Sequence, residues 1–279
     1  MPDDLHATLH ELLDDPKRFQ PLTGEDRAEF GAPALMRLDP PGTADPAAKE
    51  KRRRWLEWRA ASYPAERHSE YLARLPADLG GNGPRILISA VLTLDAGIDG
   101  YLSQFDNRQR YKITGRRPLN MGYTTAPIAH PRDHAAAIHA IIHSSAERQG
   151  RPIAASFDRR PADHSFADYD PCADARYRDI CTGVFAPDGT LAAYLLGKRV
   201  GNHVQYDEIM GHADHVAHDV MYLLHIAFLR QCLEQEVVPR CLNYGPWYSG
   251  HDPYSARGGL NFWKRKTRFR PAYLIAASS

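Results

Sequence analysis

A basic segment near the C-terminus, Lys264-Arg-Lys-Thr-Arg-Phe-Arg270, concentrates positive charge in a chain whose formal net charge is only +1. Clustered cations bind phosphate through their local field even when the whole molecule is nearly neutral. A single well-placed cation can also stabilise a developing oxyanion. The alternative is a solvated face, and the shorter cluster Lys51–Arg54 is more typical of that alternative.

An aromatic stretch, Tyr244–Tyr254, comes shortly before the basic segment and holds three tyrosines and Trp247. Tyr244 and Tyr248 flank Gly-Pro-Trp, where a phenol can donate a hydrogen bond or relay a proton. Aromatic rings in such a loop can also stack on a nucleobase or a substrate ring. Ordinary core packing is the competing interpretation of the same residues.

Two adjacent carboxylates, Asp207 and Glu208, lie in the apolar stretch Val204–Met210, which the sequence predicts to be a strand. Successive side chains of a strand point to opposite faces, so at most one of the two faces a given cleft. A carboxylate there can accept a proton from an amine or hold an ammonium group. Asp207 is the first candidate for the proton acceptor.

Several other site types are not predicted. His212, His215 and His218 have a spacing of three, but no fourth ligand and no H-E-x-x-H pattern accompany them, so we predict no metal site. A helix entry with Asp214 or Asp219 as N-cap is the preferred interpretation of the segment. The chain also contains no G-x-S-x-G elbow and no G-x-x-x-x-G-K or G-x-G-x-x-G phosphate loop.

The composition, 43% hydrophobic and 25% charged over 279 residues, is that of an ordinary globular protein. The four cysteines form no C-x-x-C pair and are expected to be small buried hydrophobes. The apolar stretches Ile86–Leu94 and Met221–Leu229 are far shorter than the roughly 20 residues that a bilayer requires. The N-terminus lacks a secretory pattern, so we predict a cytoplasmic protein without membrane insertion.

The hydrophobic pattern alternates between strands and helices, which predicts an α/β protein with a mixed sheet and helices on its faces. The strongest local signal is a hairpin of Asp179–Ala186 and Thr190–Lys198 across Pro187-Asp-Gly189. The other expected strands are Arg85–Leu94, Gly122–Ile128, Val204–Met210, Arg240–Tyr244 and Arg270–Ala276, and the expected helices are Asp95–Arg110, His130–His143 and Val216–Glu236.

The order of these elements resembles that of GNAT acyltransferases, in which a central hairpin and a further strand lead into a long helix. The stretch Gly258-Gly-Leu-Asn-Phe-Trp-Lys-Arg-Lys-Thr-Arg-Phe-Arg-Pro271 resembles the "GL..FKR..GF.P" ending of that family. Lys264 matches the lysine of the motif, whereas Arg268 stands where a glycine usually would. The resemblance covers residues 95 to 273 and implies a GNAT-like domain at 95–279, behind a trimmed N-terminal subdomain at 1–94.

Within the superfamily the chain is most similar to the Fem-like branch, which moves an amino acid from aminoacyl-tRNA onto an amine. Residues Asp106–Tyr123 resemble the Arg/Lys-rich helix and following strand that begin the second Fem domain. Ordinary GNAT enzymes bind the pyrophosphate of acetyl-CoA in a glycine-containing turn at a helix N-terminus. The corresponding segment here is Gly211-His-Ala-Asp-His-Val-Ala-His-Asp219, whose bulky and acidic side chains disfavour a pyrophosphate.

The resemblance therefore implies an aminoacyltransferase that uses charged tRNA as co-substrate and needs no other cofactor. The expected acceptor is the amine of a small peptide, a cell-wall precursor or a peptide-antibiotic precursor. The expected catalytic residues are Lys264, Asp207 and Tyr244, the expected substrate-binding residues are Glu208, Trp247 and Tyr248, and the expected tRNA contacts are Arg265, Lys266, Arg268 and Arg270. An acyl-CoA-dependent N-acyltransferase and a non-catalytic tRNA- or peptide-binding module remain the alternatives.

Overall fold

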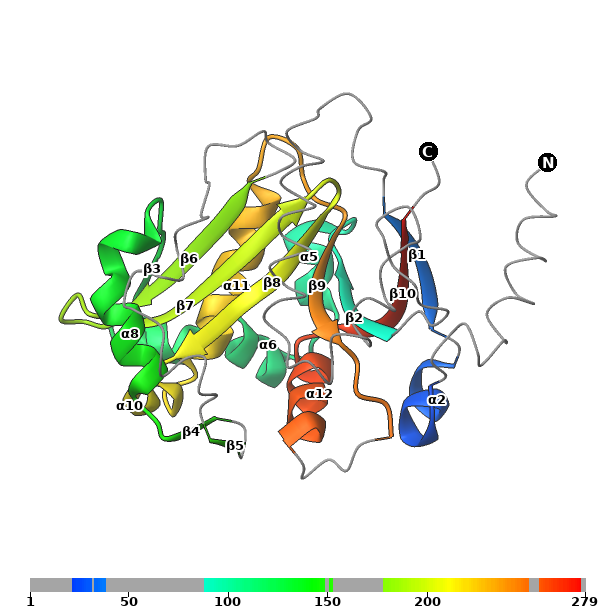
Figure 1. Ribbon diagram of the computed structural model, residues 1–279, viewed down its shortest axis with the longest axis horizontal. Helices are drawn as coiled ribbons and strands as arrows, with labels where there is room; N and C mark the ends of the chain where they lie inside the picture. The colour runs from blue at the N-terminus through cyan, green and yellow to red at the C-terminus, as the bar shows by residue number, and fades with distance from the viewer. Residues whose placement is uncertain are drawn as a thin grey trace. The chain divides into compact units, whose positions relative to one another are not determined.

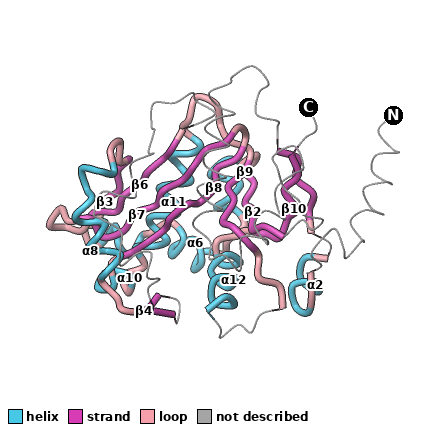
Figure 2. The backbone as a smooth tube through the Cα atoms, viewed as in Figure 1, coloured by secondary structure: helices cyan, strands magenta, loops and turns pink. Residues whose placement is uncertain are grey.

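The computed structural model of the chain describes residues 22–31, 33–38, 88–148, 151–152, 178–250 and 256–276. The chain divides into two compact units, which we call the central unit (Leu92–Asn243) and the terminal unit (Met1–Val91 with Tyr244–Ser279). Both unit boundaries fall inside strands, one in β2 (Ile88–Thr93) and one in β9 (Cys241–Pro246) (Figures 1 and 2). The predicted division into a subdomain at 1–94 and a domain at 95–279 stays a prediction.

The central unit is built on an antiparallel meander of β6 (Asp179–Phe185), β7 (Leu191–Val200) and β8 (His203–Gly211). Strand β3 (Thr124–Pro127) pairs antiparallel with β6 at one edge. At the other edge the start of β9 runs parallel to β8, through the three pairs that begin at His203↔Cys241 and end at Gln205↔Asn243. The predicted mixed sheet is therefore confirmed. A separate small hairpin joins β4 (Glu147–Arg148) and β5 (Arg151–Pro152).

The predicted β6–β7 hairpin is confirmed, and Asp188 fixes its turn. One carboxylate oxygen of Asp188 accepts hydrogen bonds from the Thr190 backbone N–H at 3.0 Å and from the Thr190 hydroxyl at 2.7 Å. These hydrogen bonds stabilise the carboxylate and lower the pKa of Asp188. Gly189 has a φ of 85°, which only glycine adopts without strain.

Helices cover both faces of the central sheet (Figure 1). Helix α8 (Ala135–His143), which follows the short helix η2 (Pro131–His134), packs its isoleucines against Tyr194 and Leu196 of β7. Helix α11 (Val220–Leu233) lies on the face to which the alternate residues Leu195 and Gly197 point. A Cβ on Gly197 would stand 2.4 Å from the Phe228 ring, so glycine permits this close approach.

Two predicted helices differ from the observed ones, and an aspartate lies at each difference. The helix expected at Val216–Glu236 begins only at Val220, as α11. Asp219, with a left-handed φ of 64°, separates it from the preceding α10 (Ala213–Val216). The helix expected at Asp95–Arg110 becomes α5 (Gly97–Ser103) and α6 (Asn107–Ile113). Asp106 caps α6 by accepting the Gln109 N–H at 2.8 Å, a role for which aspartate is strongly favoured.

The terminal unit contains a strand ladder in which β1 (Ala34–Leu38) runs parallel to β10 (Arg270–Ala276), and β10 pairs antiparallel with β2. Two helices complete its described part, α2 (Gly24–Phe30) and α12 (Ala256–Lys266). The bounds of β10 are the predicted ones, whereas α12 was not predicted as a helix. The cluster Lys51–Arg54, Tyr254 and Cys172 lie outside the described residues.

Arg268 ends α12 in a left-handed conformation, with a φ of 62°. The Arg268 N–H donates to the Arg265 carbonyl at 3.0 Å, and the Phe269 N–H donates to the Lys264 carbonyl at 2.9 Å. These two bonds form a Schellman motif, whose left-handed position is normally glycine. The substitution of the expected glycine by arginine has therefore left the turn intact, at the cost of backbone strain.

No described helix is both long enough and apolar enough to span a bilayer.

His225 of α11 is a fully buried titratable group in the core of the central unit. The Tyr101 hydroxyl lies 3.0 Å from its Nε2 and the Tyr206 hydroxyl lies 3.0 Å from its Nδ1. Burial opposes the charged imidazolium and lowers the pKa of His225 to about 3.

We expect Arg268→Gly to raise the free energy of unfolding by about 1 kcal/mol, because glycine removes the left-handed strain. Urea denaturation measures the change. Arg268→Ala is the control, since it removes the same charge and keeps the Cβ; an equal gain in both variants would attribute the effect to charge instead.

We expect acid to destabilise the protein through His225, because the unfolded histidine takes up a proton below its ordinary pKa of 6.5 and the folded one does not. Between pH 7 and pH 5 this group lowers the free energy of unfolding by about 2 kcal/mol. Denaturation curves at both pH values should show a smaller loss for His225→Gln than for the native chain. Equal losses would show that the loss of stability arises at other groups.

Candidate active site

Lys264 lies on a face of α12 that is polar and buried. Asn261, Lys264 and Thr267 follow one another at a spacing of three and are 7%, 2% and 0% exposed, whereas Phe262 is 60% exposed. An isolated surface helix normally buries its apolar side chains and exposes its polar ones. Such an inversion of the usual pattern is expected at functional sites.

The Lys264 ammonium group is held by a carbonyl and two rings. Its Nζ donates a hydrogen bond to the Pro246 carbonyl at 2.5 Å. It lies 5.2 Å from the centre of the Tyr244 ring and 5.0 Å from that of Tyr248. Burial disfavours the charged form and lowers the pKa of Lys264 to about 7. A lysine in this environment can give up or take a proton near neutral pH.

Tyr244 is the other predicted catalytic residue in this cluster. Its ring lies 5.6 Å from that of Phe269, centre to centre. Burial raises the pKa of Tyr244, and the neighbouring Tyr248 adds to the effect. Tyr244 therefore stays protonated at neutral pH and is suited to donate a hydrogen bond rather than to act as a base.

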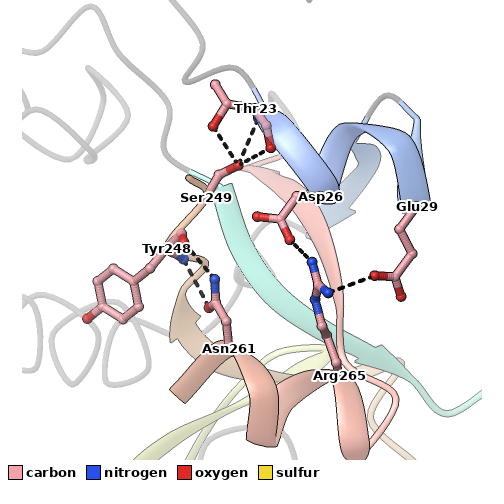
Figure 3. A network of polar contacts seen from close by, with 7 residues as sticks. All are labelled: Thr23, Asp26, Glu29, Tyr248, Ser249, Asn261 and Arg265. Atoms are coloured by element: carbon pink, nitrogen blue, oxygen red, sulfur yellow. Dashed lines mark hydrogen bonds and ion pairs between the residues drawn. The ribbon is translucent and has the colours of Figure 1, made fainter. Parts of the chain in front are cut away.

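Asn261 holds the backbone of Tyr248, and Figure 3 shows the pair. The Tyr248 N–H donates to Asn261 Oδ1 at 3.1 Å, while Asn261 Nδ2 donates to the Tyr248 carbonyl at 2.7 Å. This two-point contact fixes the aromatic segment to α12, one helical turn from Lys264. Asn261 was not predicted from the sequence; the polar spacing 261, 264, 267 would have indicated it once the segment was read as a helix.

Helix α2 is attached to the same cluster. The Ser249 hydroxyl accepts the Thr23 N–H at 2.8 Å (Figure 3). The ring of Phe30 meets that of Trp247 edge-on, with centroids 5.4 Å apart. Trp247 is only 1% exposed, and its indole N–H has no acceptor among the described residues. The predicted substrate-binding tryptophan is thus placed in the packed wall of the cluster.

Arg265, a predicted tRNA contact, is engaged within the terminal unit. Its guanidinium binds Asp26, which is 5% exposed, and lies 3.0 Å from a carboxylate oxygen of Glu29 (Figure 3). A tRNA phosphate would have to share the guanidinium with these two carboxylates. Of the other predicted contacts, Lys266 and Arg270 are exposed, and Arg268 is half-buried at the helix end.

Asp207 and Glu208, the remaining predicted site residues, lie on β8 in the central unit. Leu196 pairs with Glu208 and Gly197 pairs with Tyr206, so Asp207 is the extra residue of a β-bulge. The Glu208 carboxylate accepts a hydrogen bond from the Tyr194 hydroxyl at 2.5 Å. Bulges commonly redirect a side chain beside active sites.

Side chains of the segment between β8 and α11 contact α6, α7 and Tyr123. The Asp219 carboxylate, at the start of α11, lies 3.1 Å from Lys112 Nζ and 3.5 Å from an Arg117 nitrogen. The Tyr123 hydroxyl lies 2.8 Å from Nδ1 of both His215 and His218. No group of three metal-binding side chains is present among the described residues.

Comparisons with known proteins show a likeness at the level of fold. The structure of FemX superposes with a TM-score of 0.50 and 13% identity, over 68% of this chain and 60% of the FemX chain. L-PGS from Bacillus licheniformis gives a TM-score of 0.44 and 11% identity, over 67% of this chain and 58% of that one. A tandem GNAT protein from the clavulanic acid biosynthesis pathway gives a TM-score of 0.40 and 17% identity, over 67% of this chain and 51% of that one.

No protein-family model matches the chain, and no curated protein matches it significantly. The chain spans about 60% of the length of FemX. The predicted mixed α/β architecture is confirmed, and the likeness to FemX is one of fold.

Because the folded-state pKa of Lys264 lies below its ordinary value of 10.5, the native chain should gain stability as the pH rises through 7. Lys264→Met removes this dependence. We therefore expect the free energy of unfolding of Lys264→Met to exceed that of the native chain at pH 6. At pH 9 this difference should be smaller by about 2–3 kcal/mol.

Chemical denaturation at the two pH values tests this expectation. Lys266→Met is the matched control, because it removes an exposed lysine from the same helix and should leave the pH dependence unchanged. A constant difference between Lys264→Met and the native chain would mean that Lys264 keeps an ordinary pKa.

Proposed function

We propose that the protein transfers an aminoacyl group from aminoacyl-tRNA to the amine of an acceptor. The observation that carries the proposal is the buried Lys264, whose pKa is lowered to about 7 between two tyrosines and a carbonyl. Strongly shifted pKa values caused by burial are typical of functional sites. The fold shared with FemX agrees with the Fem-like resemblance of the sequence.

The reaction forms an amide bond between the acceptor nitrogen and the aminoacyl carbonyl, and breaks the ester bond to the terminal ribose. The amine loses a proton and the ribose oxygen gains one. Lys264 in its ammonium form would donate a hydrogen bond to the oxyanion of the tetrahedral intermediate and then protonate the leaving oxygen. Tyr244 would donate a second hydrogen bond.

The proton of the attacking amine needs an acceptor, and Asp207 is the proposed one. Its place in the β-bulge sets it apart from the regular alternation of β8. Glu208, whose carboxylate is engaged by Tyr194, is better suited to hold the ammonium of the acceptor. Trp247 and Tyr248 would form the apolar wall of the aminoacyl site.

Charged tRNA is favoured over acyl-CoA by the start of α11. A pyrophosphate needs exposed backbone N–H groups and no neighbouring negative charge. The residue before α11 is Asp219, whose carboxylate forms ion pairs with Lys112 and Arg117. An acyl-CoA donor would have to displace this internal anion.

The proposed tRNA contacts near the site are the exposed Lys266 and Arg270, with Arg268 and Arg265 beside them. These cations would contribute a salt-sensitive attraction that is independent of base sequence. The proposed acceptors are amines of small peptides, including cell-wall and peptide-antibiotic precursors.

Binding titrations with charged tRNA and with acetyl-CoA, at low and moderate salt, test the choice of donor. We expect salt-dependent binding of charged tRNA and none of acetyl-CoA. Firm acetyl-CoA binding without tRNA affinity would instead establish the acyl-CoA alternative.

Lys264→Met tests the catalytic role. We expect kcat for transfer from charged tRNA to an amine to fall at least about 100-fold, because the oxyanion loses its cation. The Kd for charged tRNA should change little, since the buried ammonium is not a surface contact. Arg27→Met, which removes an exposed cation from α2, is the control and should retain turnover. Undiminished turnover in Lys264→Met would refute the proposed role, and a native chain that binds tRNA without turnover would be a binding module.

A further inference from the structure

Helices α6 (Asn107–Ile113) and α7 (Arg116–Asn120) of the central unit carry an unusual concentration of positive charge. Residues 107–120 contain no aspartate or glutamate. Their cations are all exposed: Arg108, Arg110, Lys112, Arg116 and Arg117. We call these five residues the α6–α7 basic surface. A field of one sign, in a chain of net charge +1, indicates an anionic partner.

Internal ion pairs neutralise only part of this surface. Lys112 and Arg117 share one carboxylate, that of Asp219, and their side chains remain 50% and 51% exposed. Arg108, Arg110 and Arg116 have no ion-pair partner within the described ranges of the chain. At least three full positive charges are therefore available to a ligand.

The cations are displayed from a rigid support. Asp106 caps α6, and the Thr114 hydroxyl donates to the Arg110 carbonyl at its end, at 2.8 Å. Gly115, with a φ of 66°, lies so close to Leu223 of α11 that a Cβ would stand 2.7 Å from it. This contact fixes the corner between the two helices, so less conformational entropy is lost when a partner binds.

Exposed rings and chains accompany the charges. Tyr111 is 51% exposed, and Leu119 and Met121 are 44% and 42% exposed. A tyrosine beside arginines provides a stacking platform for an unpaired base as well as phosphate contacts.

We propose that the α6–α7 basic surface binds the phosphate backbone of the tRNA; this rests on the proposed function. It adds a second group of tRNA contacts to those near Lys264, in the other unit of the chain. Arginine predominates in it, and its planar, permanently charged guanidinium suits phosphate recognition.

An anionic membrane surface is the competing partner, and the pattern on the two helices disfavours it. A membrane-surface helix concentrates apolar side chains on one continuous face. Helix α6 spans only seven residues and buries Ile113, and the exposed apolar side chains are divided between Tyr111 on α6 and Leu119 and Met121 at the end of α7. Charge rather than apolar area therefore dominates this surface.

The test compares two triple variants of the full chain in binding titrations with charged tRNA across a range of salt. Arg108→Gln/Arg110→Gln/Arg116→Gln removes three charges from the surface. Arg132→Gln/Arg230→Gln/Arg240→Gln removes three exposed charges elsewhere in the central unit and is matched in net charge. For the first variant we expect affinity to fall roughly tenfold or more at moderate salt, and the slope of log K against log salt to decrease by about 2.

Turnover with a short aminoacylated CCA oligonucleotide separates this inference from the proposed function. That donor lacks the acceptor stem, so the first variant should use it as well as the native chain does, while its KM for full charged tRNA rises. A native chain that transfers from neither donor would refute the proposed function, whatever the binding data show.

Three outcomes would overturn the inference while leaving the proposed function intact. The first is an unchanged tRNA affinity and salt slope in the first variant, and the second is an equal loss of affinity in both triple variants. The third concerns a parallel titration with phosphatidylglycerol-containing vesicles: the first variant loses affinity for the vesicles but not for charged tRNA. The last outcome would assign the surface to a membrane.

Discussion

The terminal unit keeps the head group of Lys264 out of water, and much of its described structure follows from the cost of doing so. A buried ammonium is tolerated only when it is hydrogen-bonded or loses its proton. Here both apply, because the Pro246 carbonyl accepts its hydrogen bond and the pKa has fallen to about 7. The helix buries Asn261 and Lys264 while it exposes Phe262, an arrangement that folding alone would not favour.

That constraint extends to parts of the chain that are distant in sequence. The Pro246 carbonyl can serve Lys264 only while the following residues are held in place, and Asn261 holds Tyr248 from α12 itself. The same segment is anchored through Ser249 to Thr23, more than 200 residues earlier. Arg265 adds its ion pairs with α2, so a residue that the sequence predicts to contact tRNA also links α12 to α2.

Strong local signals were sufficient for much of the fold. The β6–β7 hairpin followed from Asp-Gly chemistry at its turn, and β10 has the bounds that the sequence predicted. The break at Asp106 and the late start of α11 were not predicted, because the cap of α6 and the left-handed φ of Asp219 leave the hydrophobic pattern almost unmarked. At the site, the sequence indicated Lys264 and Tyr244 as candidate catalytic residues. It could not indicate the partners of Arg265, because these depend on contacts between distant segments, which no local pattern encodes.

The two proposals require positive charge to serve two incompatible purposes, and residue type separates them. A group that gives up a proton near pH 7 must have an adjustable pKa, and lysine meets this requirement when buried. A surface that attracts phosphate must remain charged at every physiological pH, which arginine does and a desolvated lysine does not. The chain places a lysine at the buried position 264 and arginines at four of the five cationic positions of the α6–α7 basic surface. The division agrees with chemistry at one set of residues and electrostatic attraction at another.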